Sequence, residues 1–153
     1  NMNDKWTYTY PNGDKYDGEW KDGKMHGKGI YTWEGGEKHD GYWKEDKKHG
    51  KGIMTYSDGD KYDGEFKEGK RHGKGKYIYP DGKKYDGEFE DDRATGKGIM
   101  TYQNGNKYDG HWKNGLQHGQ GIMTYQNGTT YDQKWEEGNL IEYRKRKQAK
   151  TSD

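Results

Sequence analysis

The sequence of 153 residues has no cysteine, no valine and only two prolines. The absence of cysteine excludes disulfides and thiolate metal sites, and it is compatible with a reducing compartment. No apolar run approaches the roughly 20 residues that a membrane-spanning helix needs. Leucine, isoleucine and phenylalanine together number ten. That inventory is too small for a conventional two-layer core with packed helices.

The charges nearly cancel, with 28 basic and 27 acidic residues. A general nucleic-acid binder would be strongly basic, so that class of protein is excluded. Low aliphatic content is typical of disorder, but disordered chains also carry high net charge and few aromatic residues. Here 15% of the residues are aromatic and 26 are glycine. We therefore predict one folded domain with a core of aromatic rings and a systematic use of glycine.

A repeat of 23 residues organises the chain. One block begins as Tyr16-Asp17-Gly18-Glu19-Trp20 and recurs until Tyr131-Asp132-Gln133-Lys134-Trp135. A second block, His26-Gly27-Lys28-Gly29-Ile30, recurs in the same register until residues 118–122. A turn glycine, first at position 13 and last at position 128, completes each unit.

Each unit predicts two short strands, because aromatic and polar residues alternate in the first block and strand-forming residues follow the second. A six-residue loop such as Lys21–His26 would join the strands within a unit, and an Asp-Gly or Asn-Gly turn such as Pro80–Lys83 would join the units. The fold class is therefore all-β. We expect a single-layer, elongated, strongly twisted antiparallel meander of about 12 strands, on the order of 50–60 Å long.

The alternation also assigns the two faces of the sheet. Tyr16, Gly18 and Trp20 share one face, and Gly29 and Tyr31 should lie on the same side in the next strand. The glycines would leave troughs into which neighbouring rings fit. The opposite face would be charged, with lysine, aspartate and glutamate in cross-strand pairs.

This unit resembles the MORN (membrane occupation and recognition nexus) repeat, and the resemblance covers residues 6 to about 138. Asp46 and Asp92 depart from the pattern by replacing a loop glycine, and His39 replaces the leading tyrosine. Aspartate tolerates the left-handed conformation, so the loops should be intact. We divide the chain into an array over residues 1–138 (a partial unit, five full units and a partial unit) and a basic C-terminal tail over residues 139–153.

The resemblance implies a non-catalytic scaffold that works in the cytoplasm, at junctions of the cytoskeleton and the membrane, in a cilium or at the cell cortex. Related arrays also precede catalytic domains, so a regulatory domain of a larger enzyme is an alternative. The family is associated with two binding modes. One mode recognises anionic phospholipid headgroups, and the other holds a protein segment along an aromatic groove.

The aromatic rings are the candidate site, because an exposed apolar face marks an interaction surface. The alternative is that each ring belongs only to the core. We expect the groove to hold a helix or an extended peptide of a partner, or another copy of the chain. The rings are Trp20, Tyr31, Trp33, Trp43, Tyr56, Phe66, Tyr79, Phe89, Tyr102, Trp112, Tyr125 and Trp135.

The tail offers a second candidate site. Arg144, Lys145, Arg146 and Lys147 carry positive charge with no acid between them and could contact an anionic phospholipid surface. The alternative is a helical or frayed end in which Leu140, Ile141 and Tyr143 cap the last hairpin.

Repeated histidines and aspartates predict neither a metal site nor a catalytic pair. Successive histidines such as His26 and His49 are one unit apart, or about 10 Å across two strands, whereas zinc ligands lie near 2 Å from a common ion. The same spacing separates Asp17 from Asp40. We therefore expect no cofactor, no metal and no catalytic residue.

Overall fold

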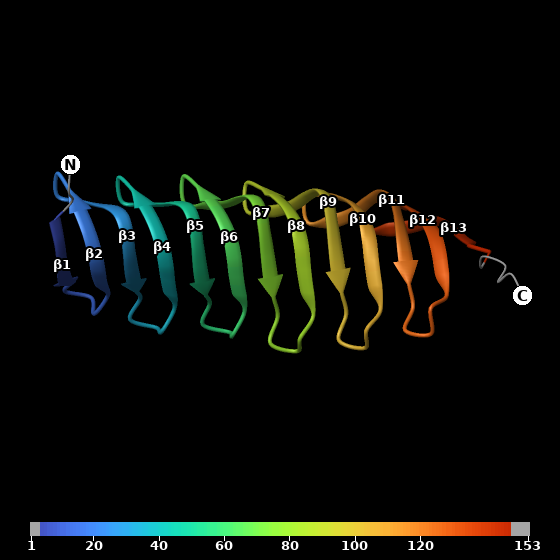
Figure 1. The fold of residues 1–153 in the computed structure, drawn as a ribbon, viewed down its shortest axis with the longest axis horizontal. Coiled ribbons are helices and arrows are strands. Elements are labelled where there is room, and N and C mark those ends of the chain that lie inside the picture. The colour runs from blue at the N-terminus through green and yellow to red at the C-terminus, as the bar shows by residue number, and fades with distance from the viewer. Residues whose placement is uncertain (1–3, 148–153) are drawn as a thin grey trace, which may run out of the picture.

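The computed structural model describes residues 4–147, which form one antiparallel sheet of 13 strands. Each strand pairs with the next strand of the chain, so the sheet is a meander without crossovers. Figure 1 shows the strands side by side along the long axis, with β1 and β13 at opposite ends of the row. The predicted all-β single-layer fold is confirmed. The strands are β1 (Asp4–Thr9), β2 (Lys15–Lys21), β3 (Lys24–Thr32), β4 (Lys38–Lys44), β5 (Lys47–Thr55), β6 (Lys61–Lys67), β7 (Lys70–Ile78), β8 (Lys84–Glu90), β9 (Arg93–Thr101), β10 (Lys107–Lys113), β11 (Leu116–Thr124), β12 (Thr130–Glu136) and β13 (Asn139–Lys145).

The turn inside each unit is shorter than predicted. Lys21 pairs directly with Lys24, so two residues rather than six connect β2 and β3. Both central residues have positive φ, as in the hairpin turns that match the twist of the strands. Asp46 and Asp92 each have a φ of 69°, so these loops keep the conformation of the glycine that they replace, as predicted.

A bulge follows in the second strand of each of the five full units. Gly18 lies opposite Gly29, but Trp20 lies opposite Met25, so β3 holds two more residues than β2 over this stretch. Gly27 adopts a φ of 82° within the bulge. In the third unit, the carboxylate of Glu65 accepts a hydrogen bond of 3.0 Å from the freed backbone N–H of Lys74. The bulge thus explains both the recurring glycine and the role of this glutamate.

Glycines leave room for tyrosine rings, as predicted. A Cβ atom at Gly64 would lie 2.7 Å from the hydroxyl of Tyr62, and one at Gly75 would overlap with the same ring. The hydroxyl of Tyr62 donates a hydrogen bond of 2.8 Å to the carbonyl of Glu65. The ring therefore lies across its own strand and the neighbouring strand, and it is fully buried without a second layer.

The core consists of these rings and of the aromatic residues that pack on their edges. Tyr62 is T-shaped to Phe66 at 5.0 Å and to Phe89 of the next unit at 5.1 Å. Such pairs repeat along the sheet, so each unit is stabilised by its neighbours. The contacts divide the core into an N-terminal cluster around Tyr16 and a longer cluster from Met54 to Trp112.

The opposite face differs from the expectation of cross-strand ion pairs. Ile53 lies between Asp40 and Asp63, and most aspartates of this row have isoleucine rather than lysine opposite them. Residues 4–147 contain three ion pairs, Lys47–Glu68, Arg71–Asp92 and Arg146–Asp132, of which the last alone includes an aspartate of this row. The prediction is wrong for most of the aspartate row, because the repeat places aspartate and isoleucine in register, but Lys51 lies opposite Glu65 and Lys74 opposite Glu88, as predicted.

The C-terminal segment extends the sheet. Residues 139–145 form β13, so the helical expectation for the tail is wrong over this range. Gly138 donates a hydrogen bond of 2.9 Å to the carbonyl of Gln117, as the turns of earlier units do. Glu142 occupies the place of the bulge glycine, and β13 holds one extra residue instead of two. The segment therefore forms a thirteenth strand. Residues 148–153 of the predicted tail lie outside the residues that the structure describes. The division of the chain into an array and a tail at residue 138 stays a prediction.

Candidate binding face

Except for Tyr31, the predicted ring residues fall into an inner row and an outer row on the aromatic face. The inner row lies in the first strand of each unit, and five of its six members are buried, with 3–8% of their surface exposed. These side chains form the core and offer little surface to a ligand, so they are separate from the binding face. The inner row consists of Trp20, Trp43, Phe66, Phe89, Trp112 and the half-buried Trp135.

The outer row lies where the second strand of each unit enters the turn to the next unit. Four of its members are half-buried, and Tyr125 is 39% exposed. Burial raises the pKa of the phenols of Tyr56, Tyr79 and Tyr102 above the ordinary value. The outer row consists of Trp33, Tyr56, Tyr79, Tyr102 and Tyr125.

Further rings extend the outer row in the first and third units, where Tyr31 and Tyr77 lie beside Trp33 and Tyr79. Tyr77 lies 4.8 Å from Tyr79 and 5.9 Å from Tyr56, measured between ring centroids. Its hydroxyl donates a hydrogen bond of 2.6 Å to Asp60, and Tyr31 makes the equivalent bond of 2.7 Å to Asp14. Burial, assisted by these acceptors, raises the pKa of both tyrosines. The hydrogen bonds fix the rings, so the surface is preorganised for contact.

Three cations of the chain lie on this surface, and the ammonium of Lys83 is 4.4 Å from the centroid of Tyr79. Lys48 places its ammonium 5.4 Å from the centroid of Trp33 and 5.5 Å from that of Phe66. Burial lowers the pKa of Lys48. Arg71 lies 5.1 Å from the centroid of Tyr77 and forms an ion pair of 3.3 Å with Asp92. The middle of the face therefore attracts and holds cationic groups through aromatic rings.

The four basic residues predicted for the lipid site do not share a face of the sheet. Arg144 lies opposite Asp132 on the polar side, whereas Lys145 lies opposite Tyr131 on the aromatic side. Arg146 is bound to Asp132 at 3.0 Å. All four nevertheless line one hollow of about 650 Å³ beside the turn before β12.

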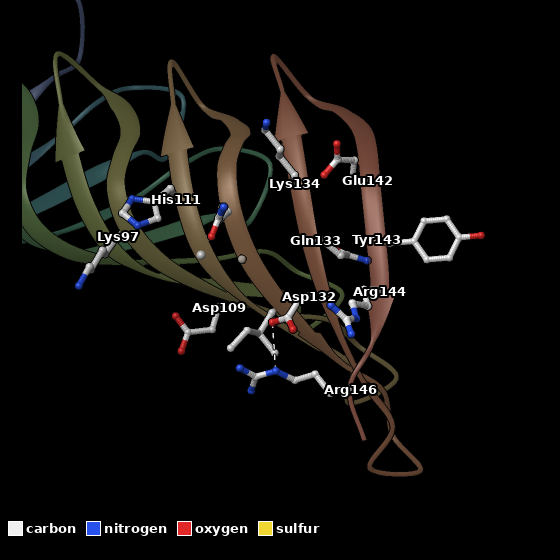
Figure 2. A pocket seen from close by; sticks show the side chains of 14 residues that line it. Lys97, Asp109, His111, Asp132, Gln133, Lys134, Glu142, Tyr143, Arg144 and Arg146 are labelled. Carbon is white, nitrogen blue, oxygen red and sulfur yellow. Dashed lines mark ion pairs between the residues drawn. The ribbon is translucent and has the colours of Figure 1, made fainter. Parts of the chain in front are cut away.

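A second hollow lies on the polar side of the C-terminal strands. It has a volume of about 520 Å³ and is lined by charges of both signs, including Lys97, Asp109, Lys134 and Glu142. Figure 2 shows Arg146 reaching Asp132 at its edge. Because the two signs are mixed, the hollow has no evident preference for an anion or a cation.

His26 and His49 of the repeat lie on β3 and β5, which are not neighbouring strands. The part of the chain that the structure describes contains no group of three or more histidine, aspartate or glutamate side chains placed to hold a metal ion. His118 instead accepts a hydrogen bond of 3.1 Å from the backbone of Glu137. Over residues 4–147 there is also no helix long and apolar enough to cross a membrane.

The N-terminal end of the aromatic face was not predicted from the sequence. Trp6, Tyr8 and Tyr10 line a cavity of about 610 Å³ together with Tyr31 and Asp46. Trp6 stacks on Trp20 with a centroid distance of 4.9 Å and an interplanar angle of 3°. The repeat spacing in the sequence could have identified this end of the face, because Tyr10 precedes Trp33 by one repeat of 23 residues and so begins the outer row.

An open sheet of stacked hairpins, with one aromatic face and turn glycines at a constant spacing, defines a linear repeat protein. The MORN repeat model matches residues 7–15, 16–38, 39–61, 62–84, 85–107 and 108–130. The chain therefore belongs to the MORN repeat family. Comparison with curated proteins gave no match.

A solved structure shares the fold. It is the SAS-4 (dCPAP) TCP domain in complex with a proline-rich motif of Ana2 (dSTIL) of Drosophila melanogaster. The TM-score is 0.55 at 12% sequence identity, and the match covers 82% of this chain and 70% of that one. At this identity, the likeness is one of fold.

Proposed function

We propose that this MORN-repeat chain is a non-catalytic module that binds an extended segment of a protein partner along the outer row. One observation carries the proposal: the outer row is half-exposed, and no element within residues 4–147 covers it. A contiguous surface of partly exposed rings marks an interaction site. Aromatic side chains supply large contact areas at a low cost in conformational entropy.

The spacing of the rings favours an extended segment over a helix. Successive members of the outer row are two strands apart, which is about 9.6 Å along the sheet. A polyproline II segment rises about 3.1 Å per residue and turns once every three residues, or about 9.3 Å. Such a segment would present the same side to each ring in turn. The α-helical pitch of about 5.4 Å matches this spacing less well.

The SAS-4 TCP domain, which shares the fold, gives independent support. That protein is in complex with a proline-rich motif. We extend this mode of binding to the present chain as a proposal, and we further propose a cytoskeletal or cortical setting, as the family resemblance implied. If the chain were a regulatory domain of a larger enzyme, it would use the same surface.

A second candidate function is recognition of anionic phospholipid. The hollow lined by Arg144, Lys145, Arg146 and Lys147 favours it. However, Arg146 is already paired with Asp132, which leaves few free charges for a membrane. Sedimentation with vesicles of phosphatidylserine and phosphatidylcholine at low and high salt tests this candidate, because exposed charges are screened by salt.

The groove is tested by selecting peptides from a displayed proline-containing library and measuring their affinity by calorimetry. Trp33→Ala and Tyr79→Ala remove rings of the outer row, and each should weaken binding at least about tenfold. Tyr42→Ala is the matched control, because Tyr42 is 50% exposed on the polar face. The proposal is wrong if the outer-row variants, folded by circular dichroism, bind as the parent does, or if Tyr42→Ala has the same effect.

A further inference from the structure

Asp46 and Asp92 stand at equivalent places, 46 residues apart, in turns with the same φ of 69° at the aspartate. Asp46 donates its N–H to the carbonyl of Met25 at 3.0 Å, and its carboxylate accepts the N–H of Met25 at 2.8 Å. Asp92 makes the same two bonds with Arg71, at 3.2 and 2.9 Å. The chain therefore contains two copies of one local structure that differ in the side chain facing the aspartate.

In the second copy, the site is filled by the chain itself. The guanidinium of Arg71 binds the carboxylate of Asp92 at 3.3 Å and donates to its carbonyl at 2.7 Å. It also lies 5.1 Å from the centroid of Tyr77 and 5.8 Å from that of Phe89. Only 20% of the arginine side chain is exposed. A carboxylate and aromatic rings thus enclose a guanidinium.

In the first copy, the carboxylate and the rings are present without the cation. Met25 occupies the place of Arg71 and is buried. Asp46 is exposed and makes no ion pair among the side chains of residues 4–147. The cavity of about 610 Å³ lies here, lined by Trp6, Tyr10 and other rings with Asp46 at its edge.

We propose that this N-terminal cavity binds the guanidinium of an arginine side chain supplied by the partner segment. The aspartate would accept charge-assisted hydrogen bonds and the rings would contribute cation–π attraction. The inference deepens the proposed function and rests on it, since Tyr10 begins the outer row along which the segment would lie. It specifies that the segment carries an arginine where it meets β1 to β4 (Figure 1).

The direct test uses two tripeptide probes, of which one carries a guanidinium and the other an alkyl chain without it. Acetyl-Gly-Arg-Gly-amide is titrated into the full chain while the indole N–H signals of Trp6 and Trp20 are followed by NMR. Acetyl-Gly-norleucine-Gly-amide is the matched ligand. We expect the arginine probe to bind with a Kd below about 10 mM and at least about tenfold more tightly than the norleucine probe. Equal affinities, or no shift with the arginine probe, would overturn the proposal.

Three variants locate the binding. Asp46→Asn keeps an oxygen acceptor for the N–H of Met25 and tolerates the left-handed conformation, so it removes charge alone. Asp46→Asn should lower the affinity for the arginine probe about tenfold, whereas Asp92→Asn should leave that affinity unchanged. Met25→Arg should place a guanidinium on Asp46 and abolish probe binding. Retained affinity in Asp46→Asn or Met25→Arg contradicts the proposal.

The failure of this inference can be told apart from a failure of the proposed function. The tripeptides are too short to span the outer row, so Tyr79→Ala should leave their affinity unchanged. A library peptide that depends on Trp33 and Tyr79 but is unaffected by Met25→Arg would sink the arginine site and keep the groove. If the arginine probe binds but the outer-row variants do not change the affinity of library peptides, the arginine site stands and the groove proposal fails.

Discussion

The imidazole of His39 lies over Gly52, at the place where four other units put a tyrosine ring over the equivalent glycine. His39 is fully buried and T-shaped to Trp43 and Phe66. Neither ring nitrogen has a hydrogen-bond partner in the described part of the chain. Three of the tyrosines donate to a backbone carbonyl three residues further on, a bond that the shorter histidine does not make.

His39→Tyr should therefore stabilise the protein. The substitution removes two unsatisfied polar atoms and supplies a hydroxyl for the carbonyl of Tyr42, in a setting that already accommodates Tyr62. We expect a gain of about 1–2 kcal/mol in the free energy of unfolding, measured by urea denaturation at pH 7. His72→Tyr, at an exposed position, is the control and should change little. A loss of stability in His39→Tyr would contradict this account of the site.

His39 should also make the stability depend on pH. Burial lowers its pKa from 6.5 to about 3. Between these values, the unfolded state binds a proton that the folded state does not, so stability falls as the pH falls. The loss between pH 7 and pH 5 should be about 2 kcal/mol. Urea unfolding of the parent and of His39→Tyr at the two pH values isolates the contribution of His39, because this loss of stability should be missing in the variant. An equal loss in both proteins would show that His39 is not its cause.

Gly75→Ala tests the packing of rings over glycine. A methyl group there would overlap with the ring of Tyr62, which is buried and cannot move without displacing Phe66 and Phe89. We expect a loss of at least about 3 kcal/mol in urea denaturation. Gly35→Ala is the matched control, since nothing lies within 4 Å of its Cβ position and its φ is not positive. That variant should be neutral or slightly stabilising, and similar losses in both variants would rule out the ring contact as the cause.

Removal of residues 139–153 tests whether the C-terminal segment belongs to the sheet. Because β13 pairs with β12 along its length, truncation after Gly138 should expose the edge of β12 and lower the midpoint of thermal unfolding by several degrees. Far-ultraviolet circular dichroism should still report a folded sheet. An unchanged midpoint would indicate that the segment adds nothing to the array.

Much of the fold could be predicted, because the repeat shows the same choice of residue many times. The spacing of Tyr62, Gly64 and Gly75 is enough to define the faces and the glycine troughs. The positive φ of Asp46 and Asp92 also followed from their place in the repeat. Periodicity is informative here because equivalent residues occupy equivalent environments.

Other features depend on contacts that a single pattern does not contain. The length of the hairpin turn follows from two consecutive left-handed residues, such as Asp22 and Gly23, whose conformation depends on the strand register. Residues 139–145 lack the repeat motif, so their pairing with β12 could not be predicted. The inner and outer rows are both aromatic and lie on the same face, so the sequence could not tell the buried Phe66 from the half-exposed Tyr79.

That difference between the two rows leads to a final prediction, in which stability separates core from surface. Phe66 is 3% exposed and packs on Tyr62 and His39, so Phe66→Ala should cost about 3–5 kcal/mol by opening a cavity between units. Tyr79→Ala should cost about 1 kcal/mol or less, because its ring is half-exposed and makes no side-chain hydrogen bond within residues 4–147. Urea denaturation of the two variants in one buffer checks the contrast. If Tyr79→Ala unfolded as readily as Phe66→Ala, the outer row would be core, and its proposed role as a free binding surface would have no basis.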